Sequence, residues 1–273
     1  MKYIALTIHT QNRTKEENEL LIAKLCETGF EGFEEKNDTL LAYIEETHYD
    51  PEITAQLLSD LEYNFNLSVI AETNWNHQWE ANFSPVLVDD FCTIKADFHE
   101  DLHPAQYEII INPKMSFGTG HHATTQLMIR AMKNMDLTEK SVLDFGTGTG
   151  ILAILAAKMN ATTIIAIDHE EWAYNNAIEN KRKNNADNIE VKQGTLTDIT
   201  QDNFQIILAN INRHVLLENM RLIYEKLSNE GKLIMSGVMV DDETIIKETA
   251  IHIGFSIDAI QELDGWIMIS VVK

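Results

Sequence analysis

The stretch VLDFGTGTG, residues 142–150, decides the fold of this chain. Its first four residues are predicted to form a short buried strand, and the apolar run 151–157 is predicted to begin a helix directly afterwards. Three glycines stand at alternate positions between the two. A strand that turns at once into a helix favours residues without a Cβ atom, and it leaves backbone N–H groups expected to face a ligand. The stretch therefore predicts a site for an anionic or strongly polar ligand.

An acidic residue narrows the choice of ligand. Asp168 ends the next predicted strand, 163–168, and stands 22 residues after Gly146. A carboxylate at this place can accept hydrogen bonds from both hydroxyls of a ribose. A dinucleotide-binding dehydrogenase is the weaker interpretation, because its G-x-G-x-x-G fingerprint needs a glycine where Ile151 stands. Asp144, the glycine turn and Asp168 together resemble the S-adenosylmethionine site of class I methyltransferases.

The composition is that of a globular chain with room for a buried core. Its 273 residues are 44% hydrophobic and 23% charged, which suits one or two domains. No apolar run approaches the ~18 residues of a membrane span, and the N-terminus lacks the pattern of a cleaved signal. Cys26 and Cys92 form neither a metal pattern nor a disulfide framework. We therefore expect a cytoplasmic protein.

The charge balance is strongly acidic. The formal net charge is −22, and residues 1–73 alone hold fifteen Asp and Glu against five Lys and Arg. Such a surface repels a phosphate backbone and attracts a basic partner, although solubility alone can also favour acidic residues. We expect a basic protein partner docked by residues 1–73, with neither membrane binding nor direct nucleic-acid binding.

Residues 1–73 are predicted to form a small separate domain with the element order βαββαβ. Thr14 and Glu17 make a capping box that opens the first helix, and Asp50 before Pro51 opens the second. This order is that of a ferredoxin-like α+β domain, a scaffold without a fixed function. A binding module for substrate recognition is the expected role.

Residues 74–106 are expected to be a linker and approach segment, and residues 107–273 a catalytic α/β domain. Helices are expected between the first six strands of this domain, and a hairpin between the last two. Helix-linked strands imply parallel crossovers, so the expected fold is the seven-stranded, Rossmann-like sheet of class I methyltransferases. Its ligand is expected at the carboxyl ends of the central strands. The predicted strands are 142–145, 163–168, 189–192, 205–209, 232–236, 256–261 and 266–272.

A second loop makes the family resemblance specific. The sequence NPKMSFGTGHHATT at 112–125, the motif DFGTGTG at 144–150 and Ala-Asn-Ile at 209–211 resemble the PrmA family, the bacterial ribosomal protein L-eleven methyltransferases. The resemblance covers essentially the whole chain. His121 and His122 in the loop have no third ligand at metal-binding spacing, so no metal site is expected.

The resemblance implies S-adenosyl-L-methionine as the cofactor and methylation of lysine side chains, the N-terminal amine, or both, in protein L-eleven. Thr125 is expected to offer its hydroxyl and backbone N–H to the cofactor. Asn210 is expected to be catalytic, orienting the incoming amine through its side-chain carbonyl. The implied cofactor contacts are Thr125, Gly146, Gly148, Asp168, Asn210 and, in the loop, Phe117 and Gly118.

Two other functions stay open at this level. A methyltransferase acting on an exocyclic amine of a nucleic-acid base often has a proline-rich, aromatic motif after the fourth strand, whereas this chain has Asn-Ile-Asn at 210–212. A non-catalytic binding protein with the same fold is the other alternative, and the intact glycines argue against it.

Overall fold

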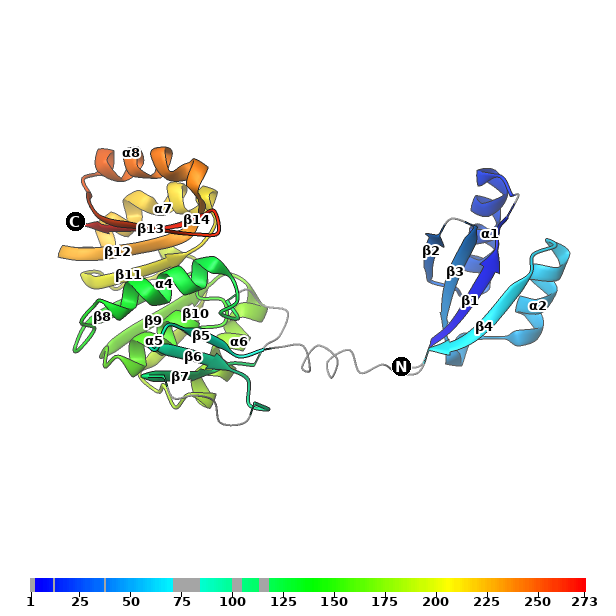
Figure 1. Ribbon diagram of the computed structural model, residues 1–273, viewed down its shortest axis with the longest axis horizontal. Coiled ribbons are helices and arrows are strands. Elements are labelled where there is room, and N and C mark those ends of the chain that lie inside the picture. Colours follow the sequence, from blue (N-terminus) through cyan, green and yellow to red (C-terminus); the bar gives the residue numbers. More distant parts are fainter. Residues whose placement is uncertain (1–2, 12, 37, 71–83, 100–104, 113–117) are drawn as a thin grey trace. The chain divides into compact units, whose positions relative to one another are not determined.

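The computed structural model describes residues 3–11, 13–36, 38–70, 84–99, 105–112 and 118–273. The chain separates into two compact units, Met1–Asn82 and Phe83–Lys273. The first unit has one sheet and one hydrophobic core, the second unit has two sheets and two cores, and Figure 1 labels their elements.

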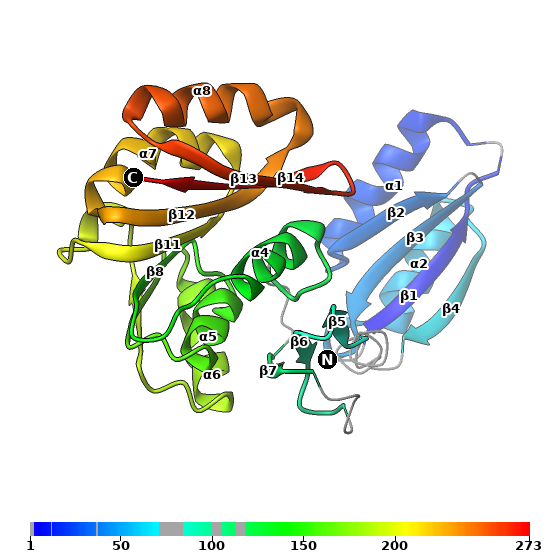
Figure 2. The same cartoon turned by 60° about the vertical axis from the view of Figure 1, so that its left-hand side comes forward.

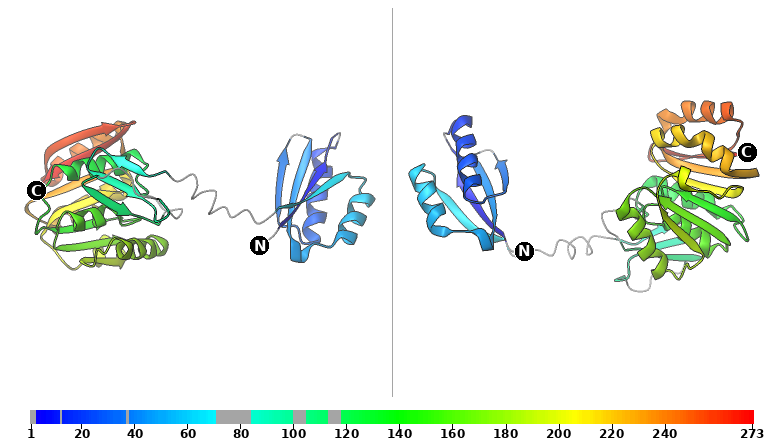
Figure 3. Two further views of the ribbon diagram at one scale, coloured as in Figure 1. Left: turned by 60° about the horizontal axis from the view of Figure 1, so that its bottom comes forward. Right: turned by 180° about the vertical axis from the view of Figure 1, so that it is seen from behind.

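The first unit is a four-stranded antiparallel sheet in the order β2-β3-β1-β4. Both helices start as predicted: Thr14 and Glu17 form the capping box of α1, and the Asp50 side chain accepts hydrogen bonds from the first turn of α2. The two helices lie on the same face of the sheet (Figure 3). The bounds are β1 (Tyr3–His9), α1 (Lys15–Glu27), β2 (Gly32–Lys36), β3 (Thr39–Glu45), η1 (Glu46–His48), α2 (Pro51–Asp60) and β4 (Phe65–Ile70).

The second unit contains a seven-stranded sheet in the order β10-β9-β8-β11-β12-β14-β13. The first five strands in this order are parallel, and β14 is antiparallel to both of its neighbours. The α/β fold expected from the sequence is confirmed. The strands are β8 (Ser141–Phe145), β9 (Thr163–Asp168), β10 (Ile189–Gln193), β11 (Phe204–Asn210), β12 (Leu227–Met239), β13 (Ser256–Leu263) and β14 (Trp266–Val272).

Helices cover both faces of this sheet (Figure 2). One face packs on α4 and α5, and α6 lies beside α5. The opposite face packs on α7 and α8. Because side chains alternate along each strand, Val142 of β8 belongs to the first core and Leu143 to the second. The helices are α4 (Ala123–Lys133), α5 (Ile151–Lys158), α6 (Glu171–Lys183), α7 (Arg213–Lys226) and α8 (Glu243–Ile253), with a 3-10 turn η3 (Val240–Asp242).

A helix expected between the third and fourth predicted strands is absent. Residues 194–203 contain only a single 3-10 turn, η2 (Leu196–Asp198). The Asp198 carboxylate accepts hydrogen bonds from the backbone N–H and the hydroxyl of Thr195, at 2.8 and 2.9 Å. Such local bonds compete with helix formation, and Asn203 ends the segment with a φ of 63°.

Part of the expected approach segment is built into the second unit. The strands β5 (Val86–Val88), β6 (Cys92–Lys95) and β7 (Tyr107–Ile110) form a separate three-stranded sheet. Buried side chains of β5 and β6 belong to the same core as α4 and α5. The described residues 84–99 and 105–106, which the sequence pattern placed in a linker and approach segment, therefore lie in the second unit.

Candidate functional site

The glycine turn after β8 has the backbone that its sequence requires. Gly146, Gly148 and Gly150 have φ angles of 74°, 53° and 80°, in the left-handed region that favours glycine. A Cβ atom on Gly146 would lie 2.3 Å from Ile211 Cγ2, and one on Gly150 would lie 3.3 Å from Ala177 Cβ. Two of the three glycines are therefore needed both for conformation and for close packing.

The N–H groups of this turn are largely used by the protein itself. Gly146 N and Thr147 N both donate to the Ile167 carbonyl of β9, at 2.9 and 3.0 Å. Gly148 N donates to Asp168 Oδ2 at 2.9 Å. The expectation that the turn presents free N–H groups to a ligand is wrong for these three residues. The turn is instead locked to the neighbouring strand, which fixes its shape before any ligand binds.

Asp168 is held in a defined orientation at the carboxyl end of β9. Its Oδ2 accepts the bond from Gly148 N, and its Oδ1 accepts one from Glu170 N at 3.1 Å. The side chain is 11% exposed, so solvent or a ligand can reach it. Because an ionised carboxylate has about four acceptor positions, two backbone donors leave capacity for the hydroxyls of a sugar.

Asp144 is buried beneath the turn and stabilises it through hydrogen bonds. Its Oδ2 accepts hydrogen bonds from the Thr147 hydroxyl at 2.5 Å and from Ala153 N at 3.2 Å. The side chain is buried, and burial raises the pKa of the carboxyl to about 6; its two hydrogen bonds oppose that rise, and the nearby Asp168 adds to it. Asp144 therefore joins the turn to the first turn of α5.

The structure brings Asn210 and Thr125 together. Asn210 ends β11, which lies next to β8 in the sheet, and its Nδ2 lies 3.5 Å from the Oγ1 of Thr125 near the start of α4. Within the described part of the chain, the Oδ1 atom of Asn210 is buried and has no hydrogen-bond partner. An unpaired buried carbonyl is costly, so this oxygen marks a place where a donor is expected.

The expectation that Thr125 offers its backbone N–H to the cofactor is wrong. Its backbone N–H donates to the His122 carbonyl at 3.1 Å, inside the first turn of the helix. The side chain is fully buried. Its Oγ1 atom accepts a hydrogen bond from Asn210 Nδ2, so the two side chains hold each other in place.

The second glycine-containing loop is tied to the first. The Gly118 carbonyl accepts a hydrogen bond from Thr149 Oγ1 at 2.8 Å, and Gly120 packs on Ile94 of β6. Phe117, the other loop residue expected near the cofactor, lies outside the described residues. Thr149 was not singled out from the sequence, since nothing local shows that its hydroxyl reaches residue 118.

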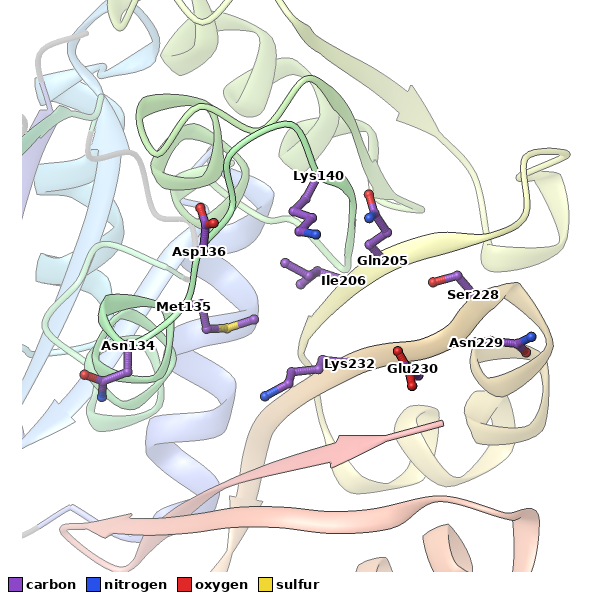
Figure 4. A pocket seen from close by; sticks show the side chains of 10 residues that line it. All are labelled: Asn134, Met135, Asp136, Lys140, Gln205, Ile206, Ser228, Asn229, Glu230 and Lys232. Atoms are coloured by element: carbon purple, nitrogen blue, oxygen red, sulfur yellow. The ribbon is translucent and has the colours of Figure 1, made fainter.

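A cavity of about 350 Å³ lies away from the glycine turn, at the end of the sheet where strands β8, β11 and β12 begin. Figure 4 shows its side chains, which come from residues 134–136 directly after α4, from Lys140 before β8 and from the early parts of β11 and β12. These are the amino ends of parallel strands, whereas ligands of such sheets bind at the carboxyl ends. Gln205 and Lys232 in its wall are used in structural contacts, to Ser141 N at 3.0 Å and to Asp258 at 3.1 Å.

The described residues contain no group of three His, Cys, Asp or Glu side chains placed to hold a metal ion. His121 Nδ1 lies 3.3 Å from Thr119 Oγ1, and His122 caps α4. In the same described ranges, no helix is long and apolar enough to cross a membrane.

Comparisons with known proteins give the family. The family model described as "Ribosomal protein L11 methyltransferase (PrmA)" matches residues 2–273. A relative named ribosomal protein L11 methyltransferase from Bacteroides thetaiotaomicron is 41% identical over 97% of this chain and 98% of its own length. One of the same name from Chlorobaculum tepidum is 39% identical over 91% of this chain and 90% of its own.

A solved structure agrees with these sequence matches. The ribosomal protein L11 methylase of Lactobacillus delbrueckii subsp. bulgaricus superimposes with a TM-score of 0.65 at 26% identity. The match covers 69% of this chain and 98% of that one.

Proposed function

Because the chain belongs to the PrmA family of ribosomal protein L11 methyltransferases, we propose that it methylates amino groups of ribosomal protein L11. It is a methyltransferase, and S-adenosyl-L-methionine is its cofactor. One observation supports the amine assignment. The Oδ1 atom of Asn210, at the end of β11, is buried and has no hydrogen-bond partner among the described residues. A buried carbonyl oxygen there suits an N–H donor, which an amine substrate supplies.

The residues around the glycine turn fit the cofactor. Asp168 would hold the ribose through the acceptor positions left by its two backbone donors. Gly146 and Gly148 would allow the backbone to approach the ligand closely, and the Thr125 hydroxyl would bind its amino-acid end. Gly118 would border the site from the second loop, together with Phe117, and Asn210 would lie beside the reacting methyl group.

When bound, the cofactor supplies an activated methyl group on a sulfonium, so a covalent enzyme intermediate is not required. The chain's own residues then align the acceptor amine. Asn210 would accept a hydrogen bond from the amine and direct its lone pair, and such alignment can lower a barrier by several kcal/mol. A lysine must first lose a proton, at a cost of about 4 kcal/mol near neutral pH, whereas an α-amine needs less than about 1 kcal/mol. Removing water from a lysine in a closed site lowers its pKa and reduces that cost.

The first unit would recruit the protein substrate by charge. Its residues 1–73 carry fifteen acidic against five basic side chains, and ribosomal proteins that bind RNA are expected to be basic. Attraction between exposed charges is screened by salt, so the Michaelis constant for the protein substrate should rise with ionic strength. The constant for the cofactor should change much less. The expected place of this reaction is the cytoplasm, where ribosomes are assembled.

Labelled S-adenosylmethionine tests the proposal. It would be offered, in parallel, to L11 purified from cells lacking its methyltransferase, to ribosomal RNA and to DNA, and label should appear in L11 alone. Mass spectrometry of the product would show whether lysine side chains, the N-terminal amine or both receive methyl groups. Label only in nucleic acid would contradict the substrate, and no label in any of the three would contradict catalysis.

A further inference from the structure

One residue of the glycine turn makes two bonds that reach outside the turn. Thr149 is fully buried, and its hydroxyl donates to the Gly118 carbonyl at 2.8 Å. Its own carbonyl accepts a bond from Asn180 Nδ2, also at 2.8 Å. Thr149 therefore connects the turn to the second loop on one side and to α6 on the other.

Asn180 carries the connection further. It is fully buried in α6, its Oδ1 accepts from Asn112 N at 2.7 Å, and its Nδ2 also donates to Asn176 Oδ1 at 2.6 Å. One turn further along, Asn184 accepts from Ile110 N at 2.9 Å. Asn176 and Asn180 in α6 and Asn184 at its C-cap are spaced four residues apart, the spacing that places side chains on the same face of a helix, and all three are buried.

Such a face is unusual for a helix interior. Asparagine has a low helix propensity, and a buried amide is stabilising only when its groups are paired. Asn180 is paired on both sides: its oxygen with the end of the segment after β7, and its nitrogen with the glycine turn. The network therefore has a defined geometry, and its two ends are Asn112 and Gly118, both in the stretch 112–125 that contains the second loop.

We propose that Thr149 and Asn180 are positioning residues for cofactor binding. Their hydrogen bonds hold Gly118 and Asn112 next to the glycine turn. This part of the cofactor site is therefore ordered before the cofactor binds. Preorganisation of this kind raises affinity because binding does not have to order this part of the site. The inference rests on the proposed cofactor site and adds two residues that do not themselves contact the ligand.

The test compares three single variants. Thr149→Val keeps the shape of the side chain and removes the hydroxyl, whereas Thr149→Ser keeps the hydroxyl. Thr249→Val is the control for the same substitution outside the network, since the Thr249 hydroxyl donates a solvent-exposed hydrogen bond to the Ile245 carbonyl within α8, also at 2.8 Å. Isothermal titration would give the dissociation constant for S-adenosylmethionine, and thermal unfolding without cofactor would give the stability of each variant.

Loss of the hydrogen bond to the part-buried Gly118 carbonyl should weaken cofactor binding of Thr149→Val by about tenfold. Thr149→Ser should bind within about threefold of the wild type, and Thr249→Val should match it. In steady-state assays, Thr149→Val should raise KM for the cofactor and keep most of kcat at saturation. Equal affinities for Thr149→Val and the wild type would overturn the inference, and so would a lowered melting temperature without a change in affinity.

Asn180 is tested separately through Asn180→Asp, which keeps the acceptor for Asn112 and removes the Nδ2 donor to Thr149 and Asn176. Its affinity for the cofactor should fall by about tenfold, and combining it with Thr149→Val should cost less than the sum of the two changes. Strict additivity would overturn a shared role. If Asn180→Asp fails to fold, the Thr149 series alone decides. Failure of the proposed function is recognised differently, since the wild type itself would then not bind S-adenosylmethionine.

Discussion

Replacing Asp144 by asparagine should change how the stability of the protein depends on pH. The carboxyl lies beneath the glycine turn, and burial raises its pKa from the ordinary 3.8 to about 6 in the folded state. The folded chain therefore binds this proton more tightly than the unfolded chain does. The stabilisation from the protonated carboxyl is fully present below the unfolded pKa, and it is lost as the pH rises toward the folded value.

The size of the effect follows from the shift. A difference of about two pKa units corresponds to about 3 kcal/mol of unfolding free energy, of which about 2 kcal/mol is lost between about pH 4.5 and about pH 7. Asparagine does not titrate, and its amide oxygen can still accept the bonds from Thr147 and Ala153. The contributions of carboxylates that do not interact with Asp144 are common to both proteins and cancel in their difference; Asp168 does interact with it, but burial is the largest cause of the shift.

Urea unfolding of the wild type and Asp144→Asn at several pH values measures this directly. The unfolding free energy of the wild type minus that of the variant should decrease by about 2 kcal/mol across that range. A constant difference would show that the carboxyl has an ordinary pKa in the folded state. A difference that increased with pH would mean that the two hydrogen bonds outweigh burial, which contradicts the reasoning.

Three further substitutions test the site. Asp168→Asn should weaken S-adenosylmethionine binding by about tenfold to a hundredfold, because bonds to a charged acceptor are lost, whereas the exposed Glu170→Gln should not; equal affinities by titration would contradict the ribose role. Asn210→Ala should lower the methylation rate by about a hundredfold with cofactor affinity nearly retained, and a full rate would contradict the orienting role. Gly146→Ala should lower the unfolding free energy by more than about 2 kcal/mol in chemical denaturation, since a Cβ there would lie 2.3 Å from a neighbouring side chain. Gly265→Ala, with a similar φ of 77° and no described atom within 4 Å, should cost only about 1 to 2 kcal/mol, and equal losses would contradict the packing argument.

Patterns confined to neighbouring residues made much of the fold predictable. The glycine turn, the capping box at Thr14 and the proline at the start of α2 each describe a local conformation, and the structure contains all three. Strands β9 and β14 begin and end where the sequence predicted, because both are clear apolar runs. The parallel pairing of the helix-linked strands and the antiparallel hairpin at the end of the sheet followed from the class of fold that such an alternation implies.

Features that depend on contacts between distant segments were not predictable. The N–H groups of Gly146 and Gly148 face β9, which only the register of two parallel strands determines. The hydroxyl of Thr149 reaches Gly118 across thirty-one positions of the chain. The asparagines of α6 had a visible spacing of four residues, and a run of uncharged amides at that spacing was a signal that could have been used.

The small sheet of β5, β6 and β7 determines where the chain can be cut if the second unit is to be transferred to another protein. Its residues Val88, Phe91 and Ile94 belong to the same apolar interior as Leu127 and Met128 of α4. A fragment starting at residue 107 would leave that interior open to water and would remove the side chain on which Gly120 rests. A fragment starting at residue 83 would carry the complete interior with it, and is therefore the piece that a domain swap between relatives should exchange.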